Sequence, residues 1–186
     1  QVEPLAQSNH LRSRTTCAVE PLAQSNRSRI DAAVAAPYRR RPMTPTYPLP
    51  PDFTADRTLP GGHYPLQRVF PGIGASPALV QAIPHPAQRQ QILAETQVEI
   101  ATENVHYMRV AADDGRVMVG IEYLAEGPIV ELYLDLVHEL THVRQFHEGL
   151  DLYDRSVSYV DRPTEIEAYD VAVTEALVRL GSTAID

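Results

Sequence analysis

The chain has 186 residues, a formal net charge of −8 and 44% hydrophobic residues. This length and composition predict a single compact domain with one core. No apolar run approaches the roughly 18 residues needed to cross a bilayer, which argues against a membrane-embedded protein. The only cysteine, Cys17, excludes an intramolecular disulfide framework and a zinc site built from thiolates.

Residues 1–60 are predicted to form an extended or disordered arm. They hold eight arginines, five acidic residues and nine prolines, and such a segment cannot bury enough apolar surface to offset its chain entropy. The eight residues from Val2 to Asn9 recur identically from Val19 to Asn26. We interpret the repeat as a duplicated linker or an artefact of expression or gene prediction, with a two-copy docking peptide as the alternative. Residues 61–186 then form the domain.

Charge is unevenly divided between these two parts. The arm carries a net charge of +3 and the remaining residues carry −11. A solvated Arg-rich tail is the default interpretation, and the alternative is intramolecular contact, with the arm lying across the acidic domain as an autoinhibitory segment or pro-segment. The acidic domain disfavours nucleic-acid binding, because phosphate contacts need a basic face. The absence of a charged-then-apolar leader favours the cytoplasm and leaves open secretion with a signal already removed.

Four elements are expected between the arm and the middle of the domain. Residues 76–83 and 86–102 predict a short and a longer helix, the second with Pro86 in its first turn. Residues 105–111 and 117–124 predict two strands joined by an Asp-Asp-Gly-Arg turn, which is a strong hairpin signal. The hairpin either covers the next helix or offers an edge strand to an extended peptide.

The next segment, from Ile129 to Gly149, predicts a long helix that contains a His-Glu-Leu-Thr-His motif. On a helix, His138 and His142 lie one turn apart on one face, spaced to bind a single zinc ion. Glu139 can then take a proton from a metal-bound water. The alternative interpretation is a pair of core histidines satisfied by hydrogen bonds.

A catalytic zinc site normally needs a third protein ligand. Gln145 and Glu148 stand where a metzincin would have glycine and histidine, and His147 is one residue out of place. A second helix is expected to open within residues 161–170, with Pro163 in its first turn, and to continue to Gly181. It supplies two other candidates, Glu165 and Glu167. Asp151 and Asp154, in the intervening loop, come after them.

Of the two candidates on the second helix, we favour Glu165 over Glu167 as the third ligand. Glu167 already has a structural role available, in a capping box with Thr164. Glu165 instead shares a small, apolar helix face that suits packing against the first helix. The other members of that face are Ala168, Tyr169, Ala172, Val173 and Ala176.

The motif from His138 to His142, followed by Glu165-Ile-Glu-Ala-Tyr on a second helix, resembles the gluzincin type of zinc metallopeptidase. The Glu-x-Glu-Ala pattern is similar to that of the integral-membrane M48 peptidases and the soluble ImmA/IrrE-like proteins. In the M48 pattern the first Glu is a ligand and an Asp one turn later supports the site. Here Tyr169 stands at that position, followed by Asp170. The resemblance covers roughly residues 128–181 and implies no particular substrate.

We therefore expect an α+β, zincin-like domain that hydrolyses peptide bonds of a peptide or protein substrate, with Zn²⁺ as cofactor and Glu139 as general base. Tyr169 and Tyr159 are the first candidates to stabilise the oxyanion, and Asp135 is the candidate to orient an imidazole. Further oxyanion candidates are Tyr153, Arg155 and His147. The alternatives are a non-catalytic zinc-binding regulatory domain and a metal-free helical interaction module with a Pro-rich docking arm.

Overall fold

The computed structural model describes residues 49–50, 52–103 and 105–180. All the described residues belong to one unit of the chain, Thr44–Asp186. Most of the predicted arm, including the repeat and Cys17, lies outside the described residues, so contact of the arm with the acidic domain stays a prediction.

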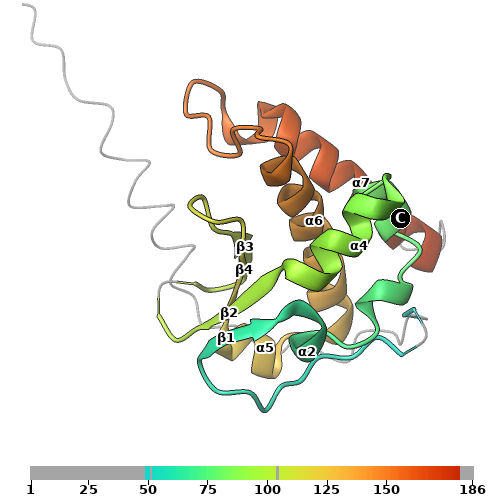
Figure 1. Cartoon of the computed structure of the whole chain (residues 1–186), viewed down its shortest axis with the longest axis vertical. Helices are drawn as coiled ribbons and strands as arrows, with labels where there is room; N and C mark the ends of the chain where they lie inside the picture. The colour runs from blue at the N-terminus through green and yellow to red at the C-terminus, as the bar shows by residue number, and fades with distance from the viewer. Residues whose placement is uncertain (1–48, 51, 104, 181–186) are drawn as a thin grey trace, which may run out of the picture. The chain divides into compact units, whose positions relative to one another are not determined.

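The described part is an α+β unit built on a four-stranded mixed sheet (Figure 1). In spatial order the strands are β1 (Gly62–Pro65), β2 (Gln97–Ala101), β4 (Val117–Gly120) and β3 (Met108–Val110). The central pair, β2 and β4, is parallel, and both outer strands are antiparallel to their neighbours. The helices are α2 (Leu66–Val69), α3 (Leu79–Ala82), α4 (Pro86–Glu95), α5 (Ile121–Glu126), α6 (Ile129–His147) and α7 (Pro163–Leu180), with 3₁₀ turns η1 (Ile73–Ala75) and η2 (Tyr159–Asp161).

Helix α6 is the centre of the core and confirms the predicted long helix. Pro128 precedes its first turn, where a missing N–H costs nothing. The helix ends in a Schellman motif: the Leu150 amide donates to the Gln145 carbonyl, and the amide of Gly149, at φ 77°, donates to the Phe146 carbonyl. Eleven of its residues are buried, so α6 presents its polar side chains within the protein rather than to water.

Helix α7 begins at Pro163, as predicted, and packs beside α6 (Figure 1). The buried Tyr133 hydroxyl joins the two helices away from the histidines, since it donates to Glu175 at 2.6 Å and lies 2.7 Å from the Ser76 hydroxyl. Arg179 neutralises the same carboxylate at 2.6 Å. This network keeps the register between the helices that carry the histidines and Glu165.

We expect Tyr133→Phe to lower the free energy of unfolding by about 1–3 kcal/mol, because it leaves a buried carboxylate without its hydroxyl donor. Urea unfolding of the full chain measures the change. Tyr107→Phe is the matched control, since the Tyr107 side chain is exposed and should change stability by less than about 0.5 kcal/mol. Equal stability of the two variants would contradict a clamping role for Tyr133.

The structure corrects the longer helix predicted over residues 86–102. Helix α4 ends at Glu95, and residues 97–101 form β2. Val98 and Ile100 alternate with Gln97 and Glu99, and β2 pairs with a strand on each side. Ladder pairing and burial therefore override the helical continuation.

The predicted hairpin is confirmed, with shorter strands, as β3 and β4. The second strand stops at Gly120, and α5 follows over residues that were expected to extend it. A Cβ at Gly120 would lie 2.2 Å from the Val105 carbonyl oxygen, so the chain approaches too closely there for any other residue. The short helix predicted over residues 76–83 is present as α3.

Residues 52–60, the last ones assigned to the arm from the sequence, contact the core in the structure. Phe53 is buried and packs edge-on against the Tyr133 ring, with centroids 5.0 Å apart. The Arg57 guanidinium donates to three carbonyls at the end of α5, those of residues 124, 125 and 127. The proline content of this segment predicted disorder, but one aromatic anchor and one capping arginine hold it in place.

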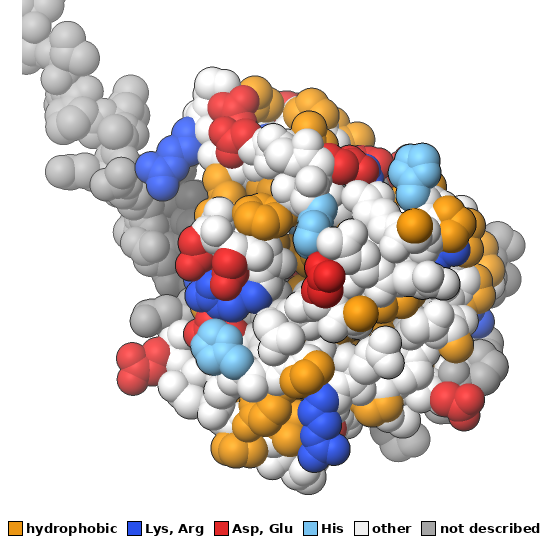
Figure 2. Space-filling model, viewed as in Figure 1, with side chains coloured by type: hydrophobic (Ala, Val, Ile, Leu, Met, Phe, Trp, Pro, Cys, Tyr) orange, Lys and Arg blue, Asp and Glu red, His pale blue; other side chains and the backbone are white. Residues whose placement is uncertain are grey.

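Two surface properties bear on the predicted partners. Within the described residues, no helix is long and apolar enough to span a membrane. On the face drawn in Figure 2, basic side chains are scattered among acidic, apolar and uncharged ones and form no continuous basic patch.

Candidate metal centre

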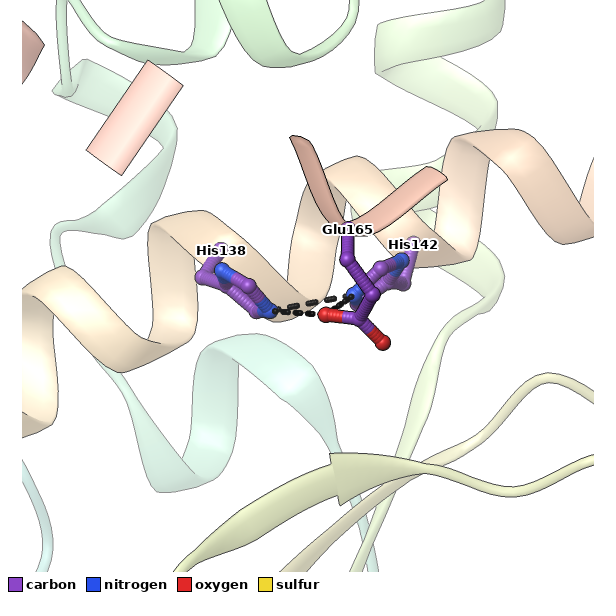
Figure 3. Close-up of side chains that lie close together, drawn as sticks. All are labelled: His138, His142 and Glu165. Atoms are coloured by element: carbon purple, nitrogen blue, oxygen red, sulfur yellow. Dashed lines mark hydrogen bonds and ion pairs between the residues drawn. The ribbon is translucent and has the colours of Figure 1, made fainter. Parts of the chain in front are cut away.

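Three potential ligand side chains converge from two helices. His138 and His142 project from α6, and Glu165 projects from the first turn of α7 toward them (Figure 3). The two Nε2 atoms lie 3.0 Å apart, and Glu165 Oε2 lies 3.5 Å from His138 Nε2 and 3.4 Å from His142 Nε2. The three residues form a buried group that could hold a metal ion.

The donor set and its spacing fit zinc. Two imidazole nitrogens and one carboxylate oxygen are ligands that zinc takes at about 2.0–2.1 Å. Tetrahedral coordination at that distance separates the ligand atoms by about 3.3 Å, close to the observed 3.0–3.5 Å. Glu165 Oε2 is also buried without a hydrogen-bond partner, and a cation would compensate it.

Glu165 reaches the histidines because it lies at the edge of the α7 packing face. The buried residues of this helix that define the centre of that face are Thr164, Ala168, Val171 and Glu175. The predicted face was therefore wrong in part, since Tyr169 and Val173 are half-exposed. From this edge position, the Glu165 carboxylate contacts both histidines and also lines a pocket. Burial raises the Glu165 pKa, but the neighbouring imidazoles outweigh it and lower the pKa to about 2.

Glu167 points to a different set of partners. It accepts a hydrogen bond from Gln145 Nε2 at 2.8 Å and forms an ion pair with Arg144 at 2.6 Å. The capping box predicted with Thr164 is absent, since the Thr164 hydroxyl is buried without a hydrogen-bond partner. The structure thus brings Glu165, and not Glu167, to the two histidines.

Gln145 orients His142, a role that the sequence pattern did not indicate. Its Oε1 lies 2.7 Å from His142 Nδ1, and its Nε2 donates to the Thr164 carbonyl at 3.0 Å as well as to Glu167. An Nδ1–H donated to Gln145 leaves the His142 Nε2 lone pair free for a metal. The i,i+3 spacing of Gln145 from His142 is the one local signal of this contact. In the comparison with the metzincin pattern, position 145 is informative only because it lacks the expected glycine, so that comparison does not indicate the contact.

We expect Gln145→Met to weaken zinc binding about 10- to 100-fold, the usual effect of losing the partner that orients a ligand. Methionine keeps the length of the side chain but accepts no comparable hydrogen bond from His142 and donates none to α7. Competition with a chromophoric chelator measures the affinity. Gln91→Met, on the exposed side of α4, is the control. Unchanged zinc affinity in both variants would contradict an orienting role for Gln145.

Glu139 lies between the two histidines in sequence but points to a separate position. It is 8% exposed, and among the described residues it has no hydrogen bond or ion pair. Burial raises its pKa to about 7, and the nearby His138 and His142 oppose that rise only in part. A carboxyl with a pKa near neutrality can both accept and release a proton.

The predicted tyrosines lie beside this group. The Tyr169 ring packs against the His138 ring, with centroids 4.6 Å apart, and its hydroxyl lies 3.2 Å from that of Tyr159. Burial raises the pKa of Tyr159, and its contacts with Tyr169 and Glu165 raise it further, so the phenol keeps its proton. The Tyr159 hydroxyl can therefore act as a donor at the edge of the site.

Other predicted residues have structural partners instead. Asp135 accepts a hydrogen bond from Tyr123 at 2.5 Å, and burial raises its pKa. Asp151 and Asp154 each accept a backbone N–H two residues further along the loop. Arg155 and His147 are exposed on the surface. None of these five belongs to the group that could hold a metal ion.

Two pockets open on the candidate site and share the residues Met108, His138, Glu139 and Tyr159. The first, which we call the β3 pocket, has a volume of about 150 Å³ and is also lined by Arg109, Val110, His142, Leu152, Tyr153 and Glu165. The second, which we call the tyrosine pocket, has a volume of about 490 Å³ and is also lined by Tyr107, Tyr123, Glu131, Asp135 and Tyr169. Glu139 therefore lines two pockets whose other residues differ in chemistry.

Comparison with known proteins finds no match to this chain among family models, curated proteins or solved structures.

Proposed function

We propose that this chain is a zinc-dependent metallopeptidase of gluzincin type, with a zincin-like domain. The observation that carries the proposal is the buried group of His138, His142 and Glu165 beside an unpaired, buried Glu139 among the described residues. A purely structural histidine pair would not require a carboxylate oxygen without a hydrogen-bond partner next to it.

In this proposal, His138, His142 and Glu165 hold the ion, and Gln145 keeps His142 in the tautomer that binds metal. Zinc supplies a Lewis acid and lowers the pKa of a bound water to about 7. The Glu139 carboxylate accepts the proton of the attacking water and passes it to the leaving amine. Tyr159 and Tyr169 donate their hydroxyl hydrogens toward the oxygen that becomes negative.

The edge strand β3 supports a peptide or protein substrate. The Tyr107 carbonyl and the Ala111 amide bond to the partner strand, so alternation directs the Val110 carbonyl to the free edge. In the structure, the Tyr153 hydroxyl donates to this carbonyl. A substrate backbone that pairs with β3 would replace Tyr153 there, which gives sequence-tolerant binding by main-chain hydrogen bonds.

The test combines metal analysis of the purified full chain with hydrolysis of a peptide library. We expect about one equivalent of zinc and cleavage that stops when a chelator removes it. Less than about 0.2 equivalents of zinc after mild purification would favour a metal-free interaction module. Stoichiometric zinc without any hydrolysis would favour a non-catalytic zinc-binding domain.

A further inference from the structure

The lining of the tyrosine pocket includes two carboxylates, those of Glu131 and Asp135, that the proposed reaction does not use. Glu131, Asp135 and Glu139 follow one another at intervals of four residues along α6, which places them on one face of the helix. All three line this pocket. Among the described residues, no arginine lines it, and His138 is the one basic side chain in its lining.

These carboxylates also have few hydrogen-bond or ion-pair partners among the described residues. Glu131 makes no hydrogen bond or ion pair with any described residue, and Asp135 accepts a single one, from the Tyr123 hydroxyl. Glu139 is more than nine-tenths buried, without a partner among the described residues. Partly buried carboxylates without partners favour the entry of a cation.

The aromatic lining has the same preference. The Tyr107 and Tyr123 rings meet edge to face, with centroids 5.4 Å apart, and the Tyr169 ring, which also lines the pocket, packs against the His138 ring. The face of a tyrosine ring attracts a cation, and a planar guanidinium stacks on it most favourably. The volume of about 490 Å³ accommodates an extended arginine side chain.

The β3 pocket provides an internal contrast. Its lining combines the cationic Arg109 with the carboxylate of Glu165 and with apolar Val110 and Leu152, so its charge is mixed. The charged residues that only the tyrosine pocket contains, Glu131 and Asp135, are both acidic. The two pockets share His138 and Glu139, so both open on the proposed reaction centre. They therefore offer a bound chain two subsites that differ in charge.

We infer that the tyrosine pocket binds a cationic group of the substrate, specifically an arginine or lysine side chain next to the bond that is cut. This inference rests on the proposed peptidase function. Glu131 and Asp135 bind the charge, and the exposed side chains of Tyr107 and Tyr169 provide ring faces for the side chain. The α-ammonium group of a peptide's first residue carries the same charge, so the experiment must separate these two sources.

The test measures binding, which does not depend on hydrolysis. Acetyl-arginine amide, acetyl-citrulline amide and leucinamide are titrated into the ¹⁵N-labelled full chain and followed by NMR. Citrulline keeps the shape of arginine without its charge. We expect acetyl-arginine amide to bind about tenfold more tightly than the citrulline compound, and Glu131→Gln to reduce that ratio to about threefold. Glu126→Gln, which removes an exposed charge from α5, should leave the ratio unchanged.

Equal affinities for the arginine and citrulline compounds would overturn the inference. Tighter binding of leucinamide than of acetyl-arginine amide would overturn the side-chain assignment and indicate the α-ammonium group instead. The proposed function is tested separately by a library of peptides with Arg, Lys, Gln or Leu at each position. If no peptide is cut while the arginine preference persists, the peptidase proposal fails and the cation pocket stands.

Discussion

Glu139→Gln should reduce peptide hydrolysis about a thousandfold while leaving zinc bound. Glutamine has nearly the same size as glutamate and cannot accept the proton, and loss of a general base costs about 10²–10⁴ in rate. The side chain is buried and has no hydrogen bond or ion pair among the described residues, so its replacement should not unfold the protein. The measurement is kcat/KM on a cleaved library peptide, with zinc content and thermal unfolding recorded on the same sample.

The control for this substitution is Glu126→Gln, which makes the same chemical change on the exposed surface of α5. It should retain full activity. Activity of the Glu139 variant within about threefold of wild type would show that another group accepts the proton. Loss of zinc together with activity would instead show that Glu139 helps to hold the metal.

Glu165→Ala should abolish stoichiometric zinc binding, and Glu167→Ala should not. The first removes a ligand and leaves two imidazoles, which we expect to weaken affinity by more than the roughly 100-fold upper effect of losing an orienting partner. The second removes an ion pair with Arg144 and one hydrogen bond from Gln145. Gln145 keeps its contacts with His142 and the Thr164 carbonyl, so zinc should stay bound with affinity reduced at most about tenfold.

These two variants are compared by metal analysis after dialysis against a weak chelator. Glu165→Gln serves as a second test of the first position, because it preserves volume where alanine opens a buried gap. Circular dichroism of the metal-free proteins separates loss of a ligand from loss of the fold. Zinc loss in the Glu167 variant alone would reverse the assignment of the third ligand.

The motif and its partner were predictable from local spacing. His138 and His142 follow a one-turn interval on a helix that has a proline at its start and a glycine at its end, and these signals act over a few residues. Glu165 is preferred over Glu167 because two residues of a helix spaced by two cannot share a face. The structure places it with the histidines, although the face itself is rotated from the one expected.

What could not be predicted depends on neighbours that are distant in the sequence. Residues 97–101 become a strand because β1 and β4 pair with them on both sides. Phe53 is held in place because it packs against the Tyr133 ring, some eighty residues later in the chain. Gln145 acquires its role only when α7 brings the Thr164 carbonyl and Glu167 within reach. The sequence pattern within each of these three segments does not indicate its contacts with residues that are distant in the sequence.

Helical spacing is a local property of the chain, and it is enough to predict the helix that carries the two histidines, the helix that carries Glu165 and the acid between the histidines. That the three side chains meet at 3.0–3.5 Å depends on how α6 and α7 pack together. Tertiary packing also places the carboxylates of Glu131 and Asp135 in the lining of a tyrosine pocket beside them. Distances between helices and the shape of a pocket follow from packing across the whole core, which local spacing does not encode.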